Sequence, residues 1–149
     1  MVSELKFIKV KNVKSPTRGT EQSAGIDFFV PDEFETMVLL PGESCFIASG
    51  IKVSLPSEHV LIAFNKSGVA VKKNLHVGAC VVDEDYQGEL HINLTNTGNS
   101  AQIIERGDKI VQFVLLPVNY TMPIEVEPKD LYVKKSTRGE GGFGSTGTK

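Results

Sequence analysis

Hydrophobic and polar residues alternate with a period of two along much of the chain. In residues 89–95, Leu90, Ile92 and Leu94 are separated by single polar residues, which is the pattern of a strand with one buried face. Similar β-rich runs occupy residues 5–10, 44–53, 60–64, 80–82 and 109–118. Short strands separated by proline and glycine turns predict an all-β sandwich, barrel or jelly roll rather than alternating strands and helices.

Two further elements complete this prediction. A short helix is expected around residues 67–73. The segment from Arg138 to Gly147 contains five glycines, and glycine loses more backbone entropy on ordering than any other residue. We therefore expect a single β domain over residues 1–135 and a flexible glycine-rich tail over residues 136–149.

The composition is that of an ordinary globular protein. The 149 residues suffice for one domain, and 40% hydrophobic with 23% charged residues excludes a largely disordered or collagenous chain. The formal net charge is only −2, so no overall field attracts polymeric nucleic acid or an anionic membrane. Any polyanionic ligand is expected to be small and locally bound.

The chain lacks an obvious targeting segment or metal cage. No apolar run approaches the roughly 18 residues of a membrane span, and the charged start lacks a signal-peptide core. These features predict a protein of the cytoplasm of a cell or host, or of the nucleus in a eukaryote, in which Cys45 and Cys80 remain reduced. The histidines, His59, His76 and His91, lack the spacing of a protein-caged zinc site.

An acidic turn and a lysine loop each follow an apolar strand. Asp83 comes directly after such a strand, where partial burial can tune a carboxylate as a base for water; a solvated hairpin turn is the simpler alternative. Tyr86 offers a flat face to a sugar or ring. Lys66 and Ser67 suit an oxyanion, although such sequences also occur in surface loops, and neither a Walker A nor a GxSxG motif is present.

Three other positions leave alternatives open. Asp27, at the head of an apolar strand, suits a structural cap, a phosphate-site carboxylate or a magnesium ligand acting through waters. Gln112, among apolar neighbours, must be satisfied by backbone or point at a ligand. Phe143 has no structural use in a solvated tail, whereas glycine N–H groups around it can enclose an anion while its ring stacks on a base.

In this order, the segments closely resemble the five motifs of the homotrimeric dUTPase family. The matching segments are residues 24–27, 65–70, 78–88, 107–112 and 138–147. The resemblance implies a distorted jelly roll or β-clip barrel that hydrolyses dUTP to dUMP and pyrophosphate. This activity limits uracil incorporation into DNA and supplies dUMP.

The resemblance also assigns roles to residues. Asp83 would be the general base that activates water against the α-phosphorus, Tyr86 would pack under the deoxyribose, and Asp27 would hold Mg²⁺ through waters. Uracil would be bound by the hairpin of Cys80, Val81 and Val82 with His91 opposite, the phosphates by Lys66, Ser67, Gly68 and Gln112, and the closing tail would supply Arg138, Phe143, Gly144, Ser145 and Thr146.

The family's active sites are shared within a homotrimer: one subunit supplies the third motif, another the first, second and fourth, and the third subunit the tail. Two residues depart from the family pattern. Lys66 replaces the usual arginine, which keeps the charge but loses the planar fork, and Cys80 replaces a glycine or another small residue.

Two alternatives differ in chemistry from a dUTPase. A dCTP deaminase shares this architecture but removes an amine from the base. A non-enzymatic β-rich binding or coat domain would leave the acidic turn and the tail merely exposed. The third and fifth motifs favour the dUTPase.

Overall fold

The computed structural model describes residues 3–149 and confirms an all-β protein with one short α-helix. The helix α1 (Ser67–Lys73) occupies the range expected from the sequence. It ends where Asn74 turns into the left-handed conformation with φ +52°. The other helical element is a single 3₁₀ turn, η1 (Pro128–Asp130). Within residues 3–149, no helix is long and apolar enough to cross a membrane.

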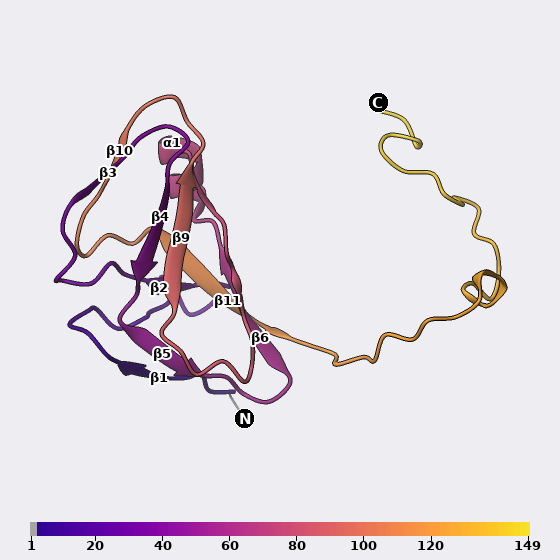
Figure 1. Cartoon of the computed structure of the whole chain (residues 1–149), viewed down its shortest axis with the longest axis horizontal. Helices are drawn as coiled ribbons and strands as arrows, with labels where there is room; N and C mark the ends of the chain where they lie inside the picture. The colour runs from indigo at the N-terminus through magenta and orange to yellow at the C-terminus, as the bar shows by residue number, and fades with distance from the viewer. Residues whose placement is uncertain (1–2) are drawn as a thin grey trace. The chain divides into compact units, whose positions relative to one another are not determined.

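The strands form four small antiparallel sheets, the arrangement of a distorted jelly roll (Figure 1). The largest sheet has the order β2 (Ile26–Phe28), β11 (Val111–Pro117), β6 (His59–Phe64) and β8 (Val81–Val82). The second has the order β4 (Ser44–Ala48), β9 (His91–Asn96) and β7 (Leu75–Val77). Two ribbons pair β1 (Lys6–Lys9) with β5 (Ile51–Ser54) and β3 (Met37–Leu39) with β10 (Gln102–Ile104).

The core lies between the sheets and follows the predicted alternation. In β9, Ile92 and Leu94 are fully buried while His91 and Asn93 are partly exposed. Asn96 is also fully buried, and its amide is satisfied because Nδ2 donates to the carbonyls of Leu39 and Ser100 at 2.9 Å each. The alternating pattern therefore sets which face of β9 carries the outward side chains.

The run over residues 44–53 is not one strand. It divides into β4 and β5 because Ser49 and Gly50 form a turn between them, with Gly50 at φ +76°. A Cβ at Gly50 would also lie 2.9 Å from Lys11 Cβ. Glycine is required here for both its left-handed backbone and the close approach of another chain segment.

The chain separates into two compact units, a body ending at Asn119 and a second unit, Tyr120–Lys149. Apart from η1, the second unit contains turns, in which Ser145 N–H donates to Gly142 and Gly147 N–H to Gly144. A functional boundary at residue 136 stays a prediction about the tail.

Candidate active site

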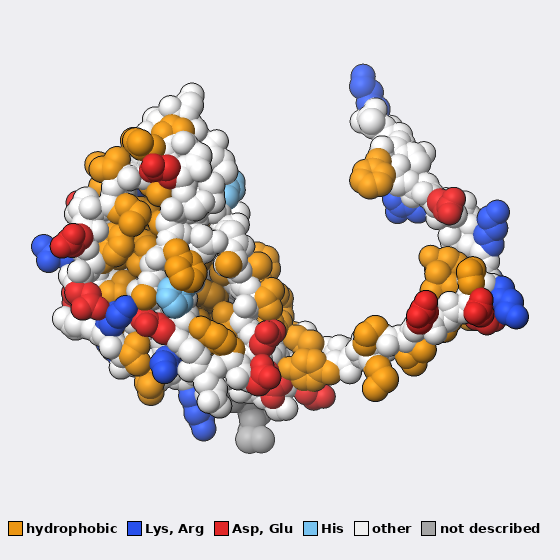
Figure 2. Space-filling model, in the orientation of Figure 1, with side chains coloured by type: hydrophobic (Ala, Val, Ile, Leu, Met, Phe, Trp, Pro, Cys, Tyr) orange, Lys and Arg blue, Asp and Glu red, His pale blue; other side chains and the backbone are white. Residues whose placement is uncertain are grey.

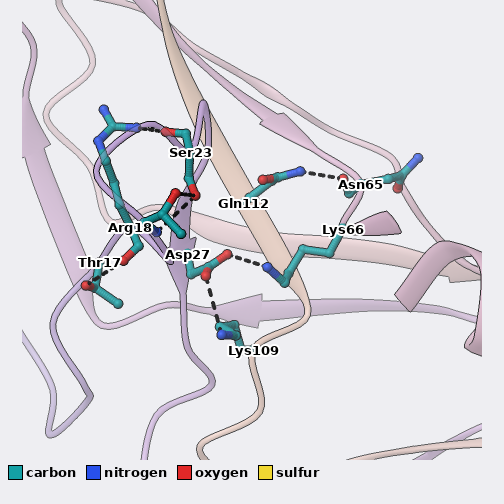
Figure 3. Close-up of polar contacts among 9 residues, drawn as sticks. Thr17, Arg18, Ser23, Asp27, Asn65, Lys66, Lys109 and Gln112 are labelled. Carbon is teal, nitrogen blue, oxygen red and sulfur yellow. Dashed lines mark hydrogen bonds and ion pairs between the residues drawn. The ribbon is translucent and has the colours of Figure 1, made fainter. Parts of the chain in front are cut away.

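A buried carboxylate between two lysines forms the first part of the site. Asp27 in β2 is 4% exposed, and the register places it beside Gln112 of β11, which pairs on its other side with Phe64 at the end of β6. Lys66, just after β6, donates to Asp27 Oδ1 at 2.5 Å, and Lys109 Nζ lies 3.5 Å from Oδ2 (Figure 3). A buried carboxylate is tolerated here because it is paired.

The side chain of Gln112 explains the glycine of the first motif. Gln112 Nε2 donates to the carbonyl of Asn65 at 2.8 Å (Figure 3), so backbone satisfies this amide nitrogen. A Cβ on Gly25 would overlap Gln112 Oε1 and lie 2.7 Å from its Cδ. The loop before Gly25 is closed by Arg18, whose Nη1 donates to the carbonyls of Ser23 at 2.7 Å and Ala24 at 3.0 Å.

A positively charged pocket of about 520 Å³ lies beside this cluster. It contains all four residues expected to bind phosphate; its lining is Lys66, Ser67, Gly68, Val69, Lys72, Lys73 and Gln112. Lys72 and Lys73 were missed from the sequence, although the helix expected over residues 67–73 places both in its last turn. Three ammonium groups make this pocket suitable for a polyanion.

A second pocket, of about 250 Å³, lies against the acidic hairpin (residues 78–91). It brings together all the hairpin residues singled out from the sequence; its lining is Phe46, Ala79, Cys80, Val81, Val82, Asp83, Tyr86, Glu89, Leu90, His91 and Phe113. Asp83 begins a turn in which Tyr86 N–H donates to its carbonyl at 3.1 Å. Its side chain is exposed in the single chain, so the partial burial expected from the sequence is not found within one copy.

Tyr86 is held in place by the residues that follow it in the hairpin, Gly88 and Glu89. Its hydroxyl donates to the carbonyl of Glu89 at 3.0 Å, and a Cβ on Gly88 would overlap the hydroxyl and lie 2.5 Å from Cζ. The Glu89 carboxylate accepts from Gly50 N–H at 2.7 Å and pairs with Lys11 at 3.3 Å. Glu89 was missed from the sequence because its partners, Gly50 and Lys11, are distant in the chain and lie next to strands β5 and β1.

His91 forms the outer wall of the pocket with Phe46. The two rings stack with centroids 4.3 Å apart and planes 5° from parallel, and His91 Nδ1 lies 3.0 Å from the carbonyl of Glu89. Phe46 is 68% exposed. Figure 2 shows hydrophobic side chains gathered around a histidine over the start of β9. Phe46 was missed because an aromatic residue in a strand ordinarily indicates core.

The two pockets have no lining residue in common. Val82 pairs with Leu61 in antiparallel β6, and the three steps from Leu61 to Phe64 span about 10 Å. Because β8 runs antiparallel to β6, Asp83 follows Val82 toward the start of β6, whereas Lys66 follows the end of β6 at Phe64. Within one copy, the acidic turn and the lysine pocket therefore lie at opposite ends of β6.

The remaining predicted residues lie in the second unit. Arg138 Nε donates to Gly141 at 2.7 Å, and the side chain of Phe143 is fully exposed. Gly144, Ser145 and Thr146 belong to the same run of turns. The structure thus sorts the predicted site residues into three groups: the lysine pocket, the acidic hairpin and the tail.

Metal-ligating side chains are dispersed. Among residues 3–149, no group of three or more histidine, cysteine, aspartate or glutamate side chains could hold a metal. Both cysteines are free thiols, as expected, and burial raises the pKa of Cys45. The part of the chain that the structure describes therefore brings no three of these side chains together as a cage of protein ligands.

The fold and these pockets define an all-β protein with a cationic pocket suited to a small polyanion and a separate pocket against an acidic hairpin. The family model for dUTPases matches residues 11–147, and the chain belongs to the dUTPase family. It is 34% identical over 146 residues to the deoxyuridine 5'-triphosphate nucleotidohydrolase of Mus musculus, covering 97% of this chain and 86% of the mouse protein. It is 38% identical over 141 residues to that of Maricaulis maris, covering 90% and 88%.

Solved structures agree with this assignment. A variant dUTPase of Staphylococcus bacteriophage 80alpha with dUpNHpp matches with a TM-score of 0.86 and 27% identity, covering 99% of this chain and all of that one. A variant dUTPase of phage phi11, in which a structural Mg(II) ion is coordinated, matches with a TM-score of 0.75 and 26% identity, covering 83% and 97%. The chain is a dUTP diphosphatase that hydrolyses dUTP, which sets aside the deaminase and the non-enzymatic domain.

Proposed function

We propose that dUTP is hydrolysed in a site shared between copies of the chain, with Asp83 activating the water that attacks the α-phosphorus. The products are dUMP and pyrophosphate. The observation that carries this proposal is the position of Asp83 in the same pocket as Tyr86 and the hairpin backbone. There a carboxylate can face the innermost phosphate of a bound nucleotide.

Separation of the two pockets supports a site shared between copies of the chain, and the family resemblance makes a homotrimer the proposed assembly. Attack at the α-phosphorus requires the base and the phosphate-binding cations around one triphosphate. Asp83 and Lys66 lie at opposite ends of β6. The distance between them along the strand exceeds that from Leu61 to Phe64. In the proposed site, the lysine pocket of a second copy completes the hairpin pocket of the first, and the tail of a third copy closes it, as the family resemblance implies.

Selection for the base and the sugar is assigned to the hairpin. The backbone of Cys80, Val81 and Val82 would pair with the uracil edge, while cytosine would leave buried donors unpaired. The ring of Tyr86, fixed by its bond to Glu89, would leave no room for a 2′-hydroxyl. Cys80 packs partly against the core, and in this proposal its side chain is directed away from the base.

The lysine pocket is assigned to the phosphates. A triphosphate carries about four negative charges, and hydrolysis concentrates charge on the phosphate oxygens near the reaction centre. Lys66, Ser67, Gly68 and Gln112 would contact these oxygens. When Lys66 turns from Asp27 to phosphate, Lys109 stays beside the other carboxylate oxygen and keeps this buried charge compensated.

The donor set fits Mg²⁺ bound through water. The described residues offer no cage of protein ligands, and Mg²⁺ usually keeps several waters and takes substrate phosphates as ligands. Each Asp27 oxygen has a second lone pair besides the one facing a lysine, so Asp27 could accept from a metal-bound water. Mg²⁺ supplied with the triphosphate would neutralise phosphate charge.

The tail is assigned to closure. Phe143 would cover the uracil, and Arg138, Gly144, Ser145 and Thr146 would contact the phosphates. The support is the exposed Phe143 in a segment whose turns bond locally. Ligand contacts would offset the entropy of ordering this glycine-rich segment.

The decisive experiment compares Asp83→Asn with Asp85→Asn, an exposed carboxylate in the same turn. We expect Asp83→Asn to lower kcat for pyrophosphate release by roughly 10²–10⁴-fold while dUpNHpp still binds. Asp85→Asn should stay near the parent. Near-parental turnover in Asp83→Asn, with dUTP cleaved to pyrophosphate, would remove Asp83 from this role.

A further inference from the structure

Asn93 lies where the chain crosses from one sheet to another. Strand β7 pairs with β9 up to Val77 opposite Leu94. Three residues further on, the same chain has left this sheet: the carbonyl of Cys80 accepts from Ala63 N–H at 2.9 Å, and Val81 pairs with Ile62 of β6. Residues 78–80 are therefore the crossover that leads into the acidic hairpin.

The side chain of Asn93 replaces the ladder hydrogen bonds lost at this crossover. Gly78 N–H still donates to the main-chain carbonyl of Asn93 at 3.0 Å. The next N–H, that of Ala79, donates instead to Asn93 Oδ1 at 2.7 Å. Asn93 Nδ2 donates to the carbonyl of Cys45 in β4 at 2.8 Å. One amide thus ties the first residues of the hairpin to the two strands behind them.

Close packing leaves the crossover little freedom to shift. A Cβ on Gly78 would overlap Asn93 Oδ1 and lie 3.1 Å from its Cγ. The Asn93 amide occupies the space that a side chain at position 78 would need. Ala79 and Cys80, directly beyond this contact, line the pocket that contains Asp83, so a displacement at Gly78 moves the pocket wall.

We propose that Asn93 is a positioning residue that sets the backbone of Ala79 and Cys80 for recognition of the base. This inference rests on the proposed assignment of uracil to the hairpin backbone. Asn93 does not line the pocket; it acts through Ala79. A main chain that pairs with a base edge discriminates only while its N–H and C=O groups keep their orientation, and this amide is what holds them.

The test compares Asn93→Leu with Thr95→Val. Both residues lie on the outward face of β9, and Thr95 Oγ1 makes one hydrogen bond, 2.7 Å from Ser44 Oγ, at the end of the strand away from the hairpin. For Asn93→Leu we expect KM for dUTP to rise about 5–50-fold, the scale of one or two lost hydrogen bonds, with kcat changed less. The ratio of kcat/KM for dUTP to that for dCTP should fall. Thr95→Val should change neither.

A second pair of variants keeps the test independent of stability. Gly78→Ala alone should raise KM like Asn93→Leu, because its Cβ displaces the amide. In an Asn93→Ala background, Gly78→Ala should add little, because the clash is gone. Thermal melting of each variant separates a loss of folded protein from a change in KM.

Three outcomes overturn the proposal. They are an unchanged KM and base selectivity in folded Asn93→Leu, equal effects of Asn93→Leu and Thr95→Val, and additive effects of Gly78→Ala and Asn93→Ala. The assignment of Asp83 is tested separately through kcat. It would survive these outcomes, since Asn93 is not proposed to affect the chemical step.

Discussion

The ion cluster around Asp27 allows a quantitative test of how the phosphate side of the site is stabilised. Replacing Asp27 by Asn keeps the side-chain shape but leaves Lys66 and Lys109 without their shared counter-charge. Removing one partner of a fully buried ion pair costs about 3–5 kcal/mol. The two lysine side chains are 22% and 47% exposed, so water compensates part of this loss. We expect a net destabilisation of about 2–3 kcal/mol, between the costs for a buried and an exposed ion pair.

Urea unfolding followed by far-UV circular dichroism suits this measurement, because the chain has no tryptophan. With a slope of roughly 1–3 kcal/mol per molar urea, the midpoint should fall by about 1 M at fixed protein concentration. The matched control is Asp32→Asn, an exposed carboxylate, which should stay within about 0.5 kcal/mol of the parent. The destabilisation of Asp27→Asn should persist in high salt, since a buried charge is screened less than an exposed one.

The reasoning fails if Asp27→Asn and Asp32→Asn unfold at the same urea concentration. It also fails if salt abolishes the difference, because the cluster would then behave as a surface ion pair. A double variant, Asp27→Asn with Lys66→Met, should recover part of the lost stability, since removing both members of a pair leaves no uncompensated charge between them.

Two further predictions concern the first motif and the tail. Gly25→Ala should displace the Gln112 amide and lower the free energy of unfolding by about 2–4 kcal/mol, through overpacking and the lost hydrogen bond to Asn65. The control is Gly68→Ala, where a Cβ meets nothing within 4 Å, and its urea midpoint should stay near that of the parent. Equal midpoints for the two variants would refute the packing argument. Truncation after Lys135 should lower kcat/KM for dUTP sharply without changing the oligomer seen by sedimentation, and an active truncated enzyme would contradict the closing role of the tail.

Local sequence patterns were sufficient to predict the longer strands and the single α-helix. The alternation through Leu90, Ile92 and Leu94 predicted which face of β9 is buried, and the range of α1 agreed with the helix expected at residues 67–73. Strands β3 and β10 were missed because three residues are too few to establish a period. The division between β4 and β5 was missed because apolar residues flank Ser49 and Gly50 on both sides, although a Ser-Gly pair often marks a turn.

By itself, the sequence determined the fold class, the ordered motifs and the types of side chain available for chemistry. Residues a few positions apart interact through the period of their own strand or turn, so these features are encoded locally. The tertiary structure decided which distant groups meet: Asp27 with Lys66 and Lys109, Gln112 with Gly25, and Asn93 with Ala79 and Cys45. Such contacts depend on strand register and on crossovers between sheets, which are set by packing of the whole core rather than by neighbouring residues.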